Sequence, residues 1–354
     1  MAVPEEKQYR VVIVGAGPAG LSCALHLRRR GVTDVLVVER AVFPRDKCCA
    51  GYVTGKTLDA YRALGLDPER DCRYALIEDF RIFHKNAFRQ RIQNRFLYTN
   101  PRIDRVELDD AFFRTAKARG VAIREDAAVT AHDPAARTVT LKDGTVLRYE
   151  AIVFADGAAG FGSRYRTKKG RNIAMQLIVP TDRPDSIEIH FGVAPAGYGW
   201  VSTYRGVTNI GLTDVYREDA DYRALFREYM DRCGIDADIE LLRGTFTPIG
   251  VGRAVLPGGT YLAGDALGAC DPMTLSGLRY GLASGERAAK AIAENDDRVL
   301  SRYAEGLRVR FALMRAMQIL FYTRPVRFLV FDIGCRCFGG AIAYVFNHFF
   351  VNKK

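Results

Sequence analysis

The N-terminal part of the chain shows an apolar pattern that changes twice. Residues 11–14 are four consecutive β-branched residues, a run typical of a strand buried on both faces of a parallel sheet. Leucine and alanine then recur at helical spacing over residues 21–27, and residues 35–38 form a second short apolar run. This order predicts a strand, a helix and a second strand, the repeating unit of a parallel α/β sheet.

The turn between the first strand and the helix carries the spacing G-x-G-x-x-G at Gly15, Gly17 and Gly20. The first glycine permits a tight turn, the second lets a pyrophosphate approach the backbone, and the third lets helix and strand pack closely. The helix N-terminus offers free N–H groups to a phosphate. Glu39 ends the second strand, 19 residues beyond the last glycine, where an acid is expected to accept a hydrogen bond from a ribose hydroxyl. Together these features predict a dinucleotide-binding unit.

Two later strands also end in polar groups. A buried apolar run is followed by Asp156-Gly157, and a later short strand ends in Gly264-Asp265. In a doubly wound sheet, ligands bind at the carboxyl ends of the strands. A helix that begins after Gly277 offers a second N-terminus to an anion or a dipole. Two helix N-termini with an aspartate at a strand end require a long cofactor with two polar regions, which FAD fits better than NAD.

Between these segments the chain has the two-residue alternation of half-buried strands, loosely over residues 74–98 and more regularly over much of 165–250. We therefore expect an α/β fold in which a Rossmann-like FAD-binding domain is interleaved with an antiparallel β-sheet substrate domain, followed by C-terminal helices. The expected ranges are 1–75, 99–162 and 253–300 for the FAD-binding domain, 76–98 and 163–252 for the substrate domain, and 301–354 for a basic amphipathic helical tail.

Arg105 stands at an unusual position. Asp104 is placed to cap a helix that begins at Arg105. The helix dipole disfavours a cation in the first turn. The position of Arg105 therefore indicates an anionic partner, for which the phosphate of a cofactor is one candidate. The alternative is an arginine exposed on the surface.

Two further segments are candidates for the chemistry. Residues 43–51 read F-P-R-D-K-C-C-A-G and predict a loop. This is either a loop at the reactive end of the cofactor, with Cys49 near the chemistry, or a surface loop with two incidental thiols. Tyr198 and Trp200, the only tryptophan, flank a glycine on a predicted strand. These two rings either line an apolar pocket or belong to the core of the sheet.

The net charge of +11 suggests an anionic partner. Residues 301–354 contain nine Arg or Lys against two acidic residues, and apolar residues recur there at helical spacing. Such a tail suits membrane lipid, nucleic acid or an acidic protein. We see no signal peptide and no run of about 18 uncharged apolar residues, so no transmembrane helix is expected. The eight cysteines show no C-x-x-C spacing, so we expect a cytoplasmic protein with reduced cysteines and no metal.

The glycine motif and the two later polar strand ends together resemble the flavoproteins of the p-hydroxybenzoate hydroxylase fold. Within that fold, residues 43–51 resemble the F-P-R-D-K-x-C-G-G loop of the geranylgeranyl reductase family, and residues 198–200 resemble its Y-x-W motif. The resemblance covers roughly residues 8–320. Two positions depart from the pattern: Ala50 replaces the first glycine of C-G-G, and V-S-T-Y follows Trp200 where prenyl reductases usually have F-P-K.

The resemblance implies that FAD is the cofactor. The implied catalytic residues are Cys49, near the flavin ring, and Tyr198 and Trp200, which would line the substrate cavity. Asp265 would hold the ribityl chain, and Pro272 would lie beside the ring. The expected FAD-binding residues are Gly15, Gly17, Ala19, Gly20, Glu39, Arg40, Arg105, Val129, Asp156, Gly157, Gly264, Asp265, Pro272, Gly277 and Leu278.

The leading interpretation is an FAD-dependent reductase of the geranylgeranyl reductase type, which reduces C=C bonds of a prenyl or other apolar substrate by hydride from reduced flavin. The alternative is an FAD-dependent monooxygenase or halogenase-like tailoring enzyme that acts on an aromatic or apolar substrate with O₂. A third is a non-enzymatic flavoprotein that binds an acidic or membrane partner. NAD(P)H or another external electron donor is left open, and no nucleic acid is expected as a partner. The tail, residues 301–354, either contacts a membrane peripherally or caps the substrate cavity.

Overall fold

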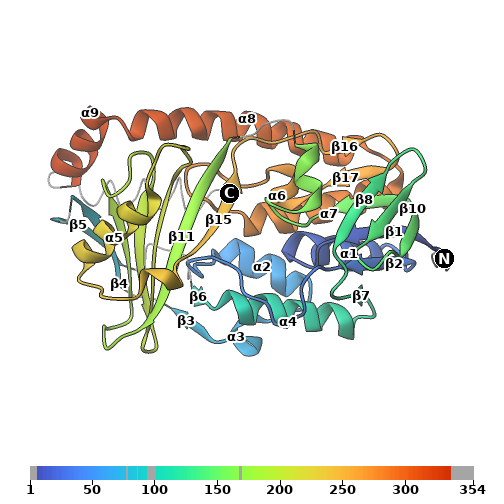
Figure 1. Cartoon of the computed structure of the whole chain (residues 1–354), viewed down its shortest axis with the longest axis horizontal. Helices are drawn as coiled ribbons and strands as arrows, with labels where there is room; N and C mark the ends of the chain where they lie inside the picture. Colours follow the sequence, from blue (N-terminus) through green and yellow to red (C-terminus); the bar gives the residue numbers. More distant parts are fainter. Residues whose placement is uncertain (1–5, 77–78, 86, 94–100, 167–169, 336–354) are drawn as a thin grey trace.

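Two sheets organise the molecule, one in the half that contains the N-terminus and one in the opposite half (Figure 1). The computed structural model describes residues 6–76, 79–85, 87–93, 101–166 and 170–335. The chain passes from one half to the other several times, and a long helix, α8 (Arg298–Phe321), runs along both. The predicted class, a Rossmann-like domain interleaved with a sheet domain and followed by helices, is confirmed.

The first sheet has the strand order β16-β17-β10-β1-β2-β7, and β1 pairs in parallel with both β2 and β10. Val11, Val12 and Ile13 in β1 have no exposed surface, because helices cover a central parallel strand on both faces. The strands of this sheet are β1 (Glu6–Val14), β2 (Val35–Val38), β7 (Ala122–Arg124), β8 (Val129–Asp133), β9 (Thr138–Leu141), β10 (Val146–Phe154), β16 (Val255–Leu256) and β17 (Thr260–Leu262).

Two helices of this half pack against each other at very short range. A Cβ on Gly285 of α7 (Leu278–Glu294) would lie 2.1 Å from the carbonyl oxygen of Ala19 in α1 (Pro18–Arg29), so only glycine fits at this contact. This packing places the N-termini of both helices at the same end of the sheet. The other helices of this half are α2 (Gly55–Ala63), α3 (Pro68–Asp71), α4 (Arg105–Ala118) and α6 (Gly264–Leu267).

The second sheet has the order β15-β11-β14-β13-β12-β4-β5. Its neighbours are antiparallel except β12 and β4, which run parallel because β4 comes from an early segment and reaches the sheet by a long crossover. Helix α5 (Tyr222–Cys233) covers one face and buries Phe226 and Tyr229 against it. The strands are β4 (Asp79–His84), β5 (Ala87–Gln93), β11 (Arg171–Pro180), β12 (Ser186–Phe191), β13 (Tyr198–Tyr204), β14 (Val207–Val215) and β15 (Arg243–Pro248); β3 (Tyr74–Leu76) and β6 (Pro101–Ile103) form a separate pair.

The C-terminal helices return to the second sheet. After α8, Pro325 lies in the first turn of α9 (Arg324–Arg327), where its missing N–H costs nothing, and the π-helix η4 (Phe328–Gly334) follows. Phe331 of η4 packs on Phe191 of β12, with 4.9 Å between ring centroids. No helix in the part of the chain that the structure describes is long and apolar enough to cross a membrane. The last part of the predicted tail, residues 336–354, lies outside the described residues.

Candidate functional site

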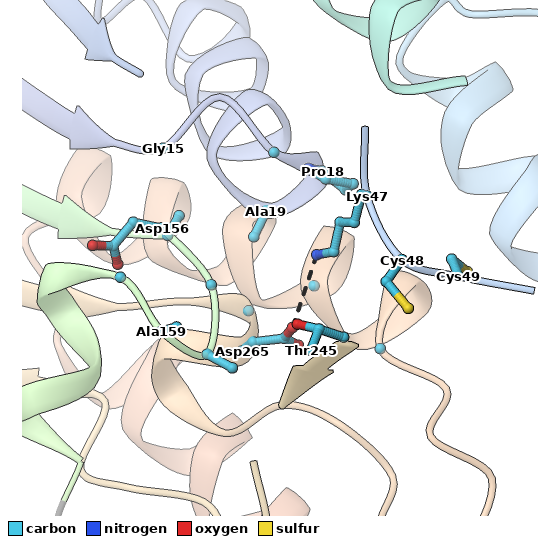
Figure 2. Close-up of a pocket in the computed structure, with 18 of the residues that line it drawn as sticks. Gly15, Pro18, Ala19, Lys47, Cys48, Cys49, Asp156, Ala159, Thr245 and Asp265 are labelled. Atoms are coloured by element: carbon cyan, nitrogen blue, oxygen red, sulfur yellow. Dashed lines mark ion pairs between the residues drawn. The ribbon is translucent and has the colours of Figure 1, made fainter. Parts of the chain in front are cut away.

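A cavity of about 800 Å³ lies between the carboxyl ends of the first sheet and the edge strand β15 of the second. Its size is within the usual range of ligand pockets, ~300–1,000 Å³. Its walls include the N-termini of α1 and α7, the Cys48–Cys49 segment and the residues that follow β2, β10 and β17 (Figure 2). The predicted site residues that line it are Gly15, Gly17, Ala19, Glu39, Arg40, Cys49, Arg105, Val129, Asp156, Gly157, Gly264, Asp265, Gly277 and Leu278.

Four predicted site residues are not among the lining residues of this cavity: Gly20, Pro272, Tyr198 and Trp200. Gly20 lies behind the turn, where a Cβ would be 1.9 Å from the carbonyl oxygen of Gly15. Gly20 is therefore a packing residue, as the motif assigns it. Pro272 and Tyr198 lie together at a small recess beside the cavity.

Trp200 is buried in the second sheet. Its Nε1–H donates to Oδ1 of Asn209 at 2.9 Å, and its ring lies over Gly211, where a Cβ would be 1.9 Å from the ring. The structure therefore favours the sheet-core interpretation for Trp200 over a place in the cavity wall. Tyr198 donates from its hydroxyl to the carbonyl oxygen of Thr274 at 2.9 Å, and burial raises its pKa.

The two helix N-termini at the cavity lack side-chain caps. α1 begins after Gly17 and α7 after Gly277, and neither glycine has a side chain to cap the first-turn N–H groups. Elsewhere Asp104 caps α4 and Asp221 caps α5, while α2 and α8 also begin without a side-chain cap. The first-turn N–H groups at the cavity are thus left for a ligand, and anions are favoured there.

Two carboxylates at the cavity are held in place by backbone groups. Glu39 accepts hydrogen bonds from the N–H groups of Ala16 at 2.8 Å and Ala41 at 3.0 Å. Asp156 accepts from the N–H of Gly162 at 3.0 Å, and its carboxylate points away from Lys47 into the loop after β10 (Figure 2). Burial raises the pKa of Asp156 to about 6, against the effect of this hydrogen bond. Asp156 therefore shapes the loop that forms one wall.

Arg105 has its anionic partner one helical turn away. Its guanidinium makes a bidentate pair with Asp109, with N–O distances of 2.9–3.1 Å, and Asp109 also lies 3.5 Å from Nη1 of Arg45. Asp104 accepts from the N–H of Val106 at 2.8 Å, which confirms the predicted cap. Arg105 is buried yet lines the cavity, so the surface alternative is wrong, and both arginines place positive charge at the cavity wall.

The Cys49 loop, defined as residues 43–51, is tied to both halves of the molecule. On the first half, Nζ of Lys47 lies 3.9 Å from Oδ2 of Asp265 across the cavity (Figure 2). On the second half, Asp46 pairs with Arg243 of β15. The loop is therefore a wall of the cavity rather than a separate surface feature, and it brings Cys48 and Cys49 to the cavity together.

Comparison with known proteins identifies the fold that carries this cavity. Residues 8–189 match the FAD binding domain, which is just over half of the chain. This chain belongs to the FAD-binding domain family. The expected fold and its FAD cofactor are thereby confirmed, and the chain is an FAD-dependent oxidoreductase.

The relatives of this FAD-dependent oxidoreductase include several reductases. A menaquinone reductase of Mycobacterium tuberculosis is 29% identical over 346 residues, covering 86% of this chain and 83% of the relative. A digeranylgeranylglycerophospholipid reductase of Methanothermobacter thermautotrophicus is 24% identical over 323 residues, covering 81% and 78%. The expected likeness to the geranylgeranyl reductase family is confirmed.

Solved structures show how widely this fold is shared. A geranylgeranyl bacteriochlorophyll reductase-like protein of Thermoplasma acidophilum aligns with a TM-score of 0.77 at 18% identity, covering 93% of this chain and 92% of that chain. A flavin-dependent brominase aligns with a TM-score of 0.64 at 20% identity, covering 96% and 94%. At these identities the likeness concerns the fold alone.

The residues at the cavity fit FAD. A Cβ on Gly157 would meet no atom within 4 Å, and one on Gly17 only Arg45 at 3.5 Å, so both glycines leave room for a ligand against the backbone. Uncapped N–H groups and two arginines suit a pyrophosphate, while Glu39 and Asp265 can accept hydrogen bonds from hydroxyl groups. Among the described residues, no cluster of His, Cys, Asp or Glu could hold a metal ion.

Two site residues were missed by the sequence analysis. Oε1 of Gln176 accepts from the N–H of Cys49 at 2.8 Å, and Nδ2 of Asn209 donates to the carbonyl oxygen of Cys49 at 3.2 Å and to Oε1 of Gln176 at 3.3 Å. Because Asn209 also accepts from Trp200, the amide of Asn209 links the tryptophan to the loop. The available signal was a polar amide in each of two apolar strands, β11 and β14, and both amides are buried.

Proposed function

We propose that this FAD-dependent oxidoreductase reduces isolated C=C bonds of a prenyl or other apolar substrate. The observation that carries the proposal is that one cavity contains both uncapped helix N-termini and the Cys49 loop. The names of the relatives support the same class of reaction, since they include reductases of prenylated lipids.

The thiol of Cys48 at the cavity wall stays protonated and therefore neutral. Burial, together with the neighbouring Cys49 and Asp46, raises the pKa of Cys48 to about 12. A thiol with a raised pKa is a poor nucleophile, because the reactive form is the thiolate. Cys48 therefore suits contact with an apolar chain better than covalent catalysis, and Val53 and Leu275 line the same cavity.

When bound, reduced FAD supplies the hydride for such a reduction. The chain's own part is to orient the alkene against the cofactor and to exclude water. Reduction also needs a proton on the second carbon, and we assign it to Sγ–H of Cys49, which regains a proton from water after the product has left. The two electrons would have to come from an external donor, NAD(P)H or another reductant.

The product distinguishes this reaction from that of a monooxygenase. The enzyme should be supplied with an electron donor and a polyprenyl lipid, and the product analysed by mass spectrometry while O₂ is monitored. A gain of two hydrogens per reduced double bond, without coupled O₂ use, supports the reductase. A product that gains one oxygen, with matching O₂ consumption, would instead show the alternative monooxygenase reaction.

A further inference from the structure

One side of helix α8 carries an unbroken apolar surface. Between residues 309 and 320 every exposed position is apolar, and Val309, Leu313 and Leu320 are 74%, 63% and 61% exposed. The spacing of these three residues places them on one helical stripe. We name the full set the α8 stripe: Val309, Ala312, Leu313, Ala316, Met317, Ile319 and Leu320. Contiguous apolar patches of this kind mark interaction sites on soluble proteins.

Positive charge borders the α8 stripe. No acidic residue occurs between Glu305 and Asp332, whereas five arginines lie in the same interval. Arg308 is held at the edge by a hydrogen bond of 3.1 Å from Nη2 to the carbonyl oxygen of Gly252, and Arg310 lies over the ring of Tyr280. An apolar stripe with a cationic border is complementary to an anionic bilayer, whose acyl region takes the apolar side chains and whose headgroups take the arginines.

The end of α8 connects this surface to the cavity. Phe321 at the end of α8 packs on Phe331 and Phe191, with centroid distances of 5.6 and 5.4 Å. The same apolar cluster includes Phe80, whose ring centroid lies 6.3 Å from that of Tyr52, a residue of the cavity wall. A continuous apolar cluster therefore leads from the C-terminal end of α8 to the cavity.

We propose that the α8 stripe is a docking surface for an anionic lipid bilayer, which it enters to the depth of the headgroup region. Figure 1 shows α8 along one side of the molecule and across both halves. Docking through α8 would therefore bring both halves of the molecule close to the membrane. The proposal rests on the stripe and its charges. It does not require the proposed reduction, although a lipid substrate would explain why the surface adjoins the apolar cluster.

The test is sedimentation of the FAD-loaded full chain with vesicles of phosphatidylcholine alone and of phosphatidylcholine with phosphatidylglycerol. Neither vesicle contains a prenyl lipid, so binding is measured independently of turnover. The variant is Leu313→Asp with Leu320→Asp. The matched control is Leu241→Asp, since Leu241 is a 62% exposed leucine remote from α8 in the sequence, in the short helix η3 (Ile239–Leu241).

Wild type and the Leu241 control should bind anionic vesicles, and more weakly as salt shortens the Debye length from ~8 Å to ~3 Å. The double variant should bind at least about tenfold more weakly, because a fully buried leucine contributes ~10- to 100-fold to partitioning. Equal binding of the double variant and wild type would overturn the proposal. The proposal would also be overturned if the wild type forms a dimer that the double variant loses while neither protein binds vesicles. It would likewise be overturned if vesicle binding appears only after residues 336–354 are removed.

Discussion

Gly17 and Gly20 belong to one motif, yet the structure predicts opposite consequences of replacing them by alanine. A Cβ at position 20 would lie 1.9 Å from the carbonyl oxygen of Gly15, so α1 and β1 must move apart. A Cβ at position 17 would meet only Arg45, at 3.5 Å, and the backbone there has φ −77°, which alanine adopts without strain. The first substitution therefore disturbs the protein itself, and the second disturbs only the ligand.

The magnitudes follow from overpacking, which costs ~1–3 kcal/mol. In Gly20→Ala this cost should lower the Tm of the apoprotein by ~1–4 °C, because the unfolding entropy is ~2.1 cal/mol/K per residue. In Gly17→Ala the apoprotein should change by less than ~1 kcal/mol, while FAD affinity falls ~5- to 150-fold. Thermal unfolding followed by circular dichroism and FAD titration by flavin fluorescence measure the two effects. Normal FAD affinity in Gly17→Ala, or equal loss of apoprotein stability in both variants, would refute the assignment of roles.

Three further predictions concern the cavity wall. Cys49→Ala should slow reduction of the alkene and leave reduction of the flavin by dithionite unchanged, as stopped-flow absorbance would show. Equal slowing of both steps would contradict the assignment of the Cys49 thiol to substrate contact. Gln176→Leu should leave the N–H of Cys49 without its acceptor, which lowers the free energy of unfolding by ~1–3 kcal/mol. It should also lower kcat while FAD stays bound, whereas the buried control Gln318→Leu should not lower kcat. Asp156→Asn should remove a pH dependence of apoprotein stability, because burial raises the pKa of Asp156 from 3.8 to about 6. The protonated carboxyl group contributes its full share to the free energy of unfolding below pH 3.8, and this share is lost as the pH rises through about 6. Denaturation at several pH values checks this, and an unchanged profile would contradict it.

The part of the site that the sequence predicts depends on local pattern. β1, Gly15, α1 and β2 are consecutive in the chain, and each has its own periodicity or turn chemistry, so the position of Glu39 follows from counting. The partner of Arg105 was also within reach of a local rule, because Asp109 lies four residues later on the same helix.

The remaining contacts are not local. Gln176 lies 127 residues from Cys49 in the sequence, and no periodicity brings them together. Strand alternation places Trp200 on a strand but does not show which face of that strand turns toward the cavity. The packing of the second sheet decides between the pocket and core interpretations. The α8 stripe was expected only as part of a basic amphipathic tail, since helical spacing alone does not show which side is covered.

The central claim, that this FAD-dependent oxidoreductase reduces C=C bonds, is tested most directly without oxygen. The enzyme with its flavin photoreduced should be mixed anaerobically with a polyprenyl lipid while the flavin absorbance is recorded and the lipid analysed afterwards. We predict that the flavin becomes oxidised without O₂ and that the lipid gains two hydrogens for each flavin oxidised. If the flavin stays reduced with every alkene tried, and is oxidised productively only when O₂ and an aromatic substrate are added, the claim is contradicted.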